Sequence, residues 1–375
     1  MTGHDGRAAD LVSPALSRIA VIADWRLPQW DAAIRQARRA GLLARMAHLI
    51  AEAGLDGKVP PQARGHLDAG SILAEKHARD VAYELDRIAE ALSELGIKPI
   101  LLKGASYAAA GLPPSRGRLF GDIDILVPRP LIGAAETALA ARGWDAVKQD
   151  EYDQSYYRRW MHELPPLQHK SRRTTIDVHH NIVPLTSAHP VDAKRMIDAA
   201  IPATGGNFSV LNPSDMVLHA AVHLFDDGEF VNGLRDLDDI NRLLRYFSAP
   251  SGSGPGSGPD FWDDLVARAA LLRLERPLHY ALRHAARLLG TPVPPRILRD
   301  PAPAPNRIAA PLMDFVFARG LRPPHPLCRD RFTGLALGFL YLRGHCLRMP
   351  LRLLLPHLLR KAVMRRLKPA EARPA

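Results

Sequence analysis

The chain has 375 residues, 24% of them charged and 47% hydrophobic, which suits two or three globular modules and excludes a disordered protein. Its two cysteines, Cys328 and Cys346, are too few for a disulfide framework or a four-cysteine zinc site, so a reducing compartment is expected. With 50 Lys and Arg against 39 Asp and Glu, the net charge of +11 points to nucleic acid or an anionic membrane surface, provided that the charge is concentrated in one segment.

The first 95 residues are predicted to form a helical region. Apolar residues recur at helical spacing over Trp30–Glu52. A second long helix is predicted over Ile72–Leu95, with Ser71 as its N-cap and Gly96 as its stop. We treat residues 1–95 as one N-terminal helical region.

Residues 96–188 show short apolar strands that alternate with helices, a pattern typical of an α/β module. A loop rich in Pro and Gly, residues 113–121, separates the first helix from the second strand. The predicted elements, in chain order, are a strand, a helix, a strand, a helix and two strands at Ile97–Leu102, Ala105–Ala110, Asp122–Val127, Leu131–Arg142, Trp144–Lys148 and Thr174–His179.

Residues 189–342 have a helical pattern throughout and are predicted to form a helical domain. A Ser-Gly-Pro segment inside residues 249–260 reads as a flexible insert, and residues 292–305 are proline-rich and predicted to be extended. The predicted helices run over Pro213–His223, Leu234–Tyr246 and Phe261–Leu289.

Two aspartates interrupt the strand at residues 122–127. Residues two apart in a strand face the same side, so Asp122 and Asp124 lie side by side and repel each other by roughly 1 kcal/mol or more at about 4 Å. A divalent cation removes that repulsion, and carboxylate oxygens suit Mg²⁺ with substrate phosphates completing its shell. The alternative interpretation is an edge strand whose polar face is solvated.

Two further segments strengthen the metal interpretation. The strand ending at Lys103-Gly104 is followed directly by a helix, whose N-terminus can bind phosphate with help from the Lys103 charge and the Ser106 hydroxyl. Asp177, between two apolar residues of a later strand, supplies a third carboxylate. An ordinary strand-to-helix turn and a solvated strand residue are the respective alternatives.

Together these segments resemble a known family. Residues 98–245 resemble the uncharacterised bacterial nucleotidyltransferase family of the DNA polymerase beta-like nucleotidyltransferase superfamily. The sequence departs from the superfamily at Gly104, which is followed by Ala105 instead of Gly or Ser, and in a long gap before Asp122. The matching segments are Leu101-Leu102-Lys103-Gly104, Arg118, Asp122-Ile123-Asp124-Ile125-Leu126-Val127, Ile176-Asp177-Val178-His179, Leu211-Asn212-Pro213-Ser214-Asp215 and Leu234-Arg235-Asp236-Leu237.

The resemblance implies an α+β protein. Its nucleotidyltransferase-fold core would be a small mixed sheet with helices, flanked by the N-terminal helices and a larger C-terminal helical region. It implies transfer of NMP from an NTP, ATP included, to an unidentified hydroxyl or phosphate acceptor, with Mg²⁺ or alternatively Mn²⁺ and release of pyrophosphate. The catalytic and metal-binding residues would be Asp122, Asp124 and Asp177, and the nucleotide-binding residues Lys103, Gly104, Ser106 and Arg118, with Arg116 as a further candidate.

The histidines give weaker indications. His219 and His223 have a zinc-compatible spacing, but no third ligand is visible and buried core histidines are favoured. The resemblance suggests that His223 and Asp236 support the site or a helical lid. His179 shares a strand face with Asp177 and is either a support of that acid or a solvated strand end.

Most of the positive charge lies in residues 343–375, which contain nine Lys or Arg and one acid, Glu371. This basic tail is predicted to form an amphipathic helix that lies on an anionic membrane or grips an RNA backbone; a helix docked on the domain is the alternative. No secretory signal or spanning helix is visible, so a cytoplasmic protein, either free or membrane-peripheral, is expected.

The sequence leaves the acceptor open among small molecules, peptides, proteins and RNA. A second class of function also remains open, in which the chain is a non-catalytic nucleotidyltransferase-fold scaffold or an antitoxin-like binding protein. Three clustered acids favour the enzyme, because a pure scaffold has no physical need for them.

Overall fold

The computed structural model of the chain describes residues 10–147, 160–203, 205–250, 257–299 and 309–354. Its α-helices are α1 Val12–Ser17, α2 Leu27–Arg39, α3 Leu43–Glu52, α4 Pro61–Ser93, α5 Lys103–Ala109, α6 Ile132–Ala141, α8 Ala193–Asp198, α9 Pro213–Asp226, α10 Gly233–Phe247, α11 Phe261–Leu272, α12 Glu275–Leu289, α13 Pro295–Arg299, α14 Ala309–Gly320 and α15 Thr333–Arg348. Its strands are β1 Ile100–Leu101, β2 Ile123–Leu126, β3 Trp144–Ala146, β4 Leu167–His169, β5 Thr175–His179, β6 Ile201–Pro202 and β7 Ser209–Val210.

The strands form one mixed sheet in the order β3-β4-β5-β2-β1-β7-β6. β2 lies inside the sheet, parallel to β5 on one side and antiparallel to β1 on the other, and its four residues are buried. The edge-strand interpretation is therefore wrong for Asp124, which lies within β2. Asp122 directly precedes the strand and lines a cavity.

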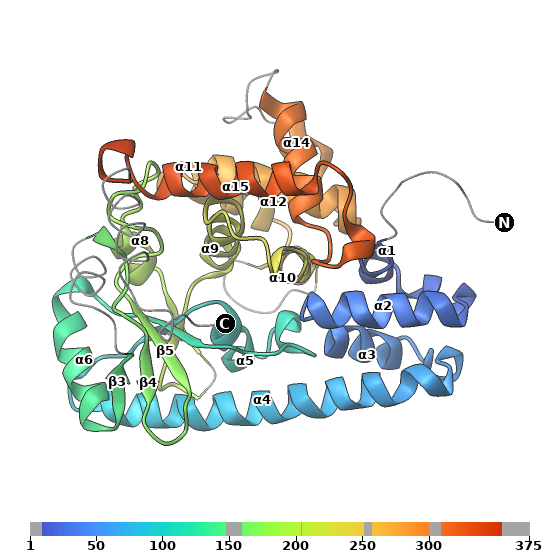
Figure 1. Cartoon of the computed structure of the whole chain (residues 1–375). Coiled ribbons are helices and arrows are strands. Elements are labelled where there is room, and N and C mark those ends of the chain that lie inside the picture. The colour runs from blue at the N-terminus through green and yellow to red at the C-terminus, as the bar shows by residue number, and fades with distance from the viewer. Residues whose placement is uncertain (1–9, 148–159, 204, 251–256, 300–308, 355–375) are drawn as a thin grey trace, which may run out of the picture.

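The helices cover the sheet and extend well beyond it. Figure 1 shows α4 running along one side of the molecule, where it contacts α3 and α2 near its start and α6 and α5 near the sheet. On the opposite side α9 forms the centre of the C-terminal helices, in contact with α10, α11, α12 and α15. Asn212 caps α9 by accepting a hydrogen bond from the backbone N–H of Asp215. The predicted α+β class is confirmed.

Several predicted boundaries were wrong, for local reasons. The helix expected over Trp30–Glu52 is two helices, because Gly41 adopts a φ of +66° between α2 and α3. The helix expected over Phe261–Leu289 is likewise divided, at the left-handed Arg273. α4 begins at Pro61, a residue suited to the first turn of a helix, so Ser71 lies inside the helix and caps nothing.

The sheet is larger and its strands are shorter than expected. β4, β6 and β7 were not predicted, because segments of two or three residues carry no recognisable alternation. The strand expected over Ile97–Leu102 pairs only at Ile100–Leu101. Part of the expected extended segment after Pro292 is the short helix α13; the remainder lies outside the described residues.

Most of the predicted insert, and residues 355–375 of the basic tail, lie outside the described residues. The start of the tail belongs to α15, where Arg343 pairs with Asp226 and Arg348 with Asp227. Those two charges are therefore engaged within the fold. Within the described ranges, none of the helices is both long and apolar enough to cross a membrane.

Candidate active site

The three predicted acids come together at two neighbouring strands. In the parallel pair of β2 and β5, Asp124 lies directly opposite Asp177, so the two side chains project from the same face of the sheet. Asp122 lies two residues earlier and shares that face. One carboxylate oxygen from each acid lies within 4.8 Å of the other two. Strand register thus produces the cluster that the sequence could only suggest.

Lys103 brings a positive charge to this cluster from the junction between β1 and α5. Its Nζ lies 3.5 Å from Oδ2 of Asp124. Its φ is +42°, a left-handed conformation that is uncommon for a residue with a side chain and typically marks a functional constraint. The junction is held to β2 by a hydrogen bond from the Leu102 N–H to the Asp124 carbonyl oxygen.

The three carboxylates have different electrostatic environments. Burial and the charge of Asp124 raise the pKa of Asp122. Burial, followed by the charges of Asp124 and Glu163, raises the pKa of Asp177 to about 7. Burial also acts against ionisation of Asp124, but the Lys103 charge and the hydrogen bond with His179 overcome it and hold the pKa of Asp124 far below its usual range.

The acid cluster therefore fits a divalent cation. Among the described residues, Oδ1 of Asp177 is buried and has no hydrogen-bond partner. An orphaned carboxylate oxygen costs free energy unless a proton or a metal satisfies it. Burial, followed by the charges of neighbouring carboxylates, raises the pKa of Asp122 and of Asp177, and a bound cation would offset both effects.

A cavity of about 310 Å³ opens beside the acid cluster. Its walls come from the start of α5, the loop before β2, the end of α9 and the start of α10. Its charged lining includes both signs: Lys103, Arg118, Asp122, Asp124, Asp227, Glu229, Arg235, Asp236 and Asp239. A polyanion with bound cations and a polar acceptor could both find partners there.

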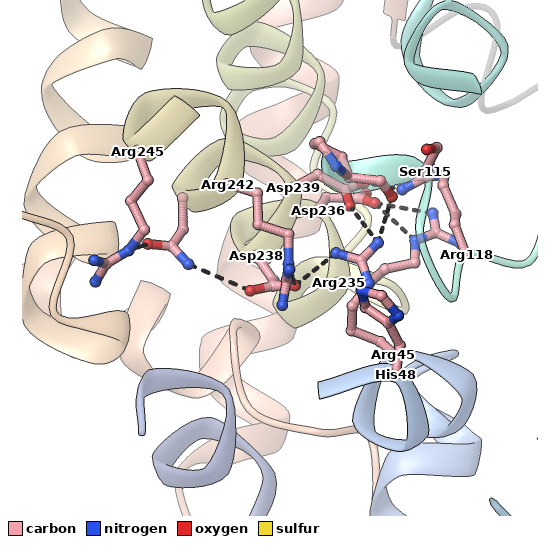
Figure 2. A network of polar contacts seen from close by, with 12 residues as sticks. Arg45, His48, Ser115, Arg118, Arg235, Asp236, Asp238, Asp239, Arg242 and Arg245 are labelled. Carbon is pink, nitrogen blue, oxygen red and sulfur yellow. Dashed lines mark hydrogen bonds and ion pairs between the residues drawn. The ribbon is translucent and has the colours of Figure 1, made fainter. Parts of the chain in front are cut away.

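Arg118 reaches the cavity from the loop before β2, and buried ion pairs hold it there. It pairs with Asp239 of α10, which in turn lies 3.3 Å from Nη2 of Arg45 on α3 (Figure 2). Nη1 of Arg45 also lies 2.9 Å from Oδ2 of Asp238. Burial lowers the pKa of Arg45 and of Arg118 to about 10, so both remain charged at neutral pH.

The loop that carries Arg118 is also fixed by close backbone approaches. Arg45 donates a hydrogen bond to the carbonyl oxygen of Pro114. Gly117 has a φ of +66°, and a Cβ there would lie 2.6 Å from the carbonyl oxygen of Ala44 on α3. Only glycine therefore allows this contact. The N-terminal helices thus position one wall of the cavity.

The predicted phosphate turn differs from expectation in detail. α5 has only seven residues, so its dipole is short, and the charge available to a phosphate comes mainly from Lys103 and Arg118. Gly104 leaves room for Arg118, whose Nε would lie 3.0 Å from an added Cβ. The Ser106 hydroxyl instead donates to the Lys103 carbonyl oxygen at 2.7 Å, and Ser106 does not line the cavity. Arg116 is exposed, 3.9 Å from Glu52.

The structure shows which of the predicted histidines lie at the cavity. His223 lines the cavity, whereas His219 is buried behind it, and burial lowers the pKa of both well below its usual value. Asp236 also lines the cavity and pairs with its neighbour Arg235 at 2.9 Å. His179 is 3% exposed, so the solvated strand end is wrong for it.

His179 supports Asp124 directly. Its Nε2 lies 3.2 Å from Oδ1 of Asp124, and its Nδ1 lies 3.3 Å from Oε2 of Glu163. Burial alone would lower the pKa of His179, but these two carboxylates raise it. Sequence reasoning missed Glu163 and Arg45, because neither stands in a motif and both reach the site through long-range packing.

Three clustered carboxylates on a mixed sheet, two of which line a cavity with basic side chains, are features of a nucleotidyltransferase. The chain belongs to the family described as uncharacterised nucleotidyltransferase, whose model matches residues 27–290. That match includes the acid cluster, Lys103, Arg118 and the start of α10. Neither the curated proteins nor the solved structures gave a match to the chain.

Proposed function

We propose that the protein is a metal-dependent nucleotidyltransferase that moves NMP from an NTP to a hydroxyl or phosphate acceptor and releases pyrophosphate. The observation that carries this proposal is the gathering of Asp122, Asp124 and Asp177 within 4.8 Å of one another, beside a cavity that also contains Lys103 and Arg118. The family match supports the transferase class.

The three acids would hold the metal. Their oxygen-only donor set suits Mg²⁺, with Mn²⁺ as the alternative. A divalent ion bound there supplies charge neutralisation for the triphosphate and alignment of the attacking and leaving oxygens. The orphaned Oδ1 of Asp177 is the atom of this chain that most clearly requires such a ligand or a proton.

The protein's own groups would position the reactants. Lys103 and Arg118 would bind phosphate oxygens, with Gly104 leaving space for Arg118. The acceptor oxygen would attack the α-phosphorus, and the bond from that phosphorus to the oxygen shared with the β-phosphate would break. Asp177 would take the acceptor's proton. Most of the rate enhancement would come from positioning and charge stabilisation.

The finer assignments remain proposals. The acceptor is a small molecule, peptide, protein or RNA, and the base of the NTP is open. Membership of the DNA polymerase beta-like superfamily and a bacterial source remain predictions. The same applies to a cytoplasmic location, with peripheral membrane contact through residues 343–375 as the alternative.

The test is transfer of label from nucleotides to acceptors in a cell extract. Each NTP, labelled at the α-phosphate, would be incubated with the full chain and Mg²⁺ or Mn²⁺. We expect one macromolecular or small-molecule fraction to acquire label and pyrophosphate to be released. Label that follows the γ-phosphate instead would show a kinase, which contradicts the proposal.

A non-catalytic scaffold is the second candidate, and one observation favours it. Asp124 already has a cationic partner on each oxygen, Lys103 and His179, so part of the acid cluster is satisfied without a metal. Calorimetry of the full chain with each NTP and Mg²⁺ separates the candidates. Binding of at least one NTP supports the enzyme, and failure of every NTP to bind supports the scaffold.

A further inference from the structure

A second cluster of metal-ligating side chains lies behind the acid cluster, on the far side of His179. His162, Glu163 and His179 each offer one ligand atom, and these atoms lie within 4.8 Å of one another. Two imidazoles and a carboxylate are the ligand types of zinc sites with an open fourth position. The Mg²⁺ proposed for the neighbouring acids prefers oxygen ligands alone, so the two clusters would select different metals.

The backbone fixes this cluster. Glu163 forms an isolated antiparallel bridge with His179, and the Leu164 N–H donates to the Val178 carbonyl oxygen at 2.9 Å. The His180 N–H donates to the carbonyl oxygen of His162 at 2.8 Å. The segment that carries His162 and Glu163 is therefore held alongside the end of β5, and the three side chains meet because of strand pairing.

The ring nitrogens of this cluster are incompletely satisfied. In the part of the chain that the structure describes, Nδ1 of His179 is buried and has no hydrogen-bond partner, and Nε2 of His162 lies 4.0 Å from Oε2 of Glu163. Nδ1 of His179 does lie 3.3 Å from Oε2 of Glu163, but the contact lacks hydrogen-bond geometry. Two ligands bound tetrahedrally to one ion at about 2.0–2.1 Å stand about 3.3 Å apart, which matches that separation.

The charges of the cluster suit a cation. Two carboxylates flank the His179 ring, Asp124 with Oδ1 3.2 Å from Nε2 and Glu163 with Oε2 3.3 Å from Nδ1. Glu163 is 20% exposed, so an ion can reach the cluster from solvent.

The hydrogen bond on the other side of the ring completes the arrangement. Nε2 of His179 lies 3.2 Å from Oδ1 of Asp124, as in metal sites where a ligating histidine donates its second ring proton to a carboxylate. With Nε2 as the donor, Nδ1 presents a lone pair toward Glu163 and His162. A metal bound there would fix this tautomer and, through it, the orientation of Asp124.

We propose that His162, Glu163 and His179 form a binding site for a transition metal of the Zn²⁺ class, separate from the three-aspartate site. The proposal does not depend on nucleotidyl transfer. It concerns a positioning element behind Asp124, and metal occupancy of this site would stabilise the local structure of β5 and the segment paired with it.

Cobalt binding tests the proposal on the full chain. Metal would first be removed by a chelating resin, and Co²⁺ would then be titrated into the wild-type chain and into an Asp122→Asn/Asp177→Asn variant that lacks the oxygen site. We expect the visible absorption of four-coordinate Co²⁺ in both proteins, at one equivalent. In the variant background, Glu163→Gln and His162→Gln should each weaken binding at least about tenfold.

His180→Gln is the matched control, since His180 adjoins His179 but is not part of the cluster. It should leave Co²⁺ affinity unchanged. X-ray absorption of the wild-type chain loaded with one equivalent of Zn²⁺ requires no substitution and should show scattering from two imidazoles. An all-oxygen shell, or cobalt binding that disappears in the Asp122→Asn/Asp177→Asn variant, would overturn the proposal.

Discussion

Lys103 is the residue whose backbone and side chain are most constrained by the site. Its left-handed φ of +42° carries a strain of about 1–3 kcal/mol that the surrounding strand and helix must overcome. Its ammonium group lies 3.5 Å from Oδ2 of Asp124, and both residues line the cavity. Lys103 thus competes with a metal for Asp124 while offering a charge to a phosphate.

This dual position predicts opposite effects on two ligands. Lys103→Met should tighten Mn²⁺ binding, because a competing cation is lost, and weaken binding of the NTP, because a phosphate contact is lost. We expect each change to be about tenfold. Isothermal titration of each ligand measures both, with Lys98→Met at an exposed site as the control. Parallel weakening of both ligands would indicate general loss of structure and contradict this assignment.

At the scale of elements, α3 and α10 are joined through a buried charge. Arg45 on α3 is 1% exposed and contacts Asp238, Asp239 and the carbonyl oxygen of Pro114 (Figure 2). Removing one partner of such a group leaves the other charges uncompensated in the interior. The N-terminal helices are therefore structural components of the cavity wall that contains Arg118.

Arg45→Met should lower the free energy of unfolding by about 3–5 kcal/mol. The matched control is Arg35→Met on α2, whose partner Asp31 is exposed and whose loss should cost at most about 1 kcal/mol. Urea denaturation followed by circular dichroism measures both variants. Equal, small effects would show that the buried network contributes nothing beyond a surface pair.

A histidine buried among the C-terminal helices is expected to make the stability of the fold sensitive to acid. His284 of α12 is 2% exposed and stacks on Phe225, and burial lowers its pKa from 6.5 to about 4. Above pH 6.5 both folded and unfolded states hold it neutral. As the pH falls toward 4, only the unfolded state takes the proton, so this residue should cost up to about 3 kcal/mol of stability.

His284→Phe keeps an aromatic ring in place and removes the titration. Its free energy of unfolding should therefore fall less steeply between pH 6.5 and pH 4 than that of the wild-type chain, by up to about 1.4 kcal/mol per pH unit. Urea denaturation at a series of pH values measures the slope. An identical slope in both proteins would show that His284 is already protonated in the folded state.

At the scale of the whole molecule, local signals predicted the ligands and long-range pairing determined their arrangement. The Asp-x-Asp spacing predicts that Asp122 and Asp124 share a face, because strand periodicity is local. That Asp177 lies opposite Asp124 depends on which strands become neighbours, and periodicity does not specify that. The role of Glu163 depends on a single bridge to β5, which no local pattern marks.

The structure also changes the interpretation of the positive charge in the tail. Arg343 and Arg348 pair with Asp226 and Asp227 at the end of α9, so only the later basic residues of the tail remain candidates for an external partner. Apart from Arg352, which is exposed, those residues lie outside the described ranges, and the predicted amphipathic helix remains a prediction.

Charge reversal in the tail tests the membrane alternative. The triple variant Lys361→Glu, Arg365→Glu and Arg366→Glu should reduce binding to phosphatidylserine vesicles by about 3 kcal/mol, or roughly 100-fold. The control is a triple reversal at exposed residues outside the tail, Arg64→Glu, Arg79→Glu and Lys98→Glu. This control has the same net charge as the tail variant and should bind vesicles like the wild-type chain. Co-sedimentation measures all three proteins, and equal binding would remove the membrane alternative.

The most direct test of the central claim is single-turnover transfer from α-labelled and γ-labelled NTP with Mg²⁺, comparing the wild-type chain with Asp124→Asn. Asp145→Asn, at an exposed acid of β3, is the control. We predict that only the α-label reaches the acceptor, that Asp124→Asn lowers the rate at least about 100-fold, and that Asp145→Asn is unaffected. Transfer that persists at the wild-type rate in Asp124→Asn would contradict the assignment of the acid cluster as the catalytic centre.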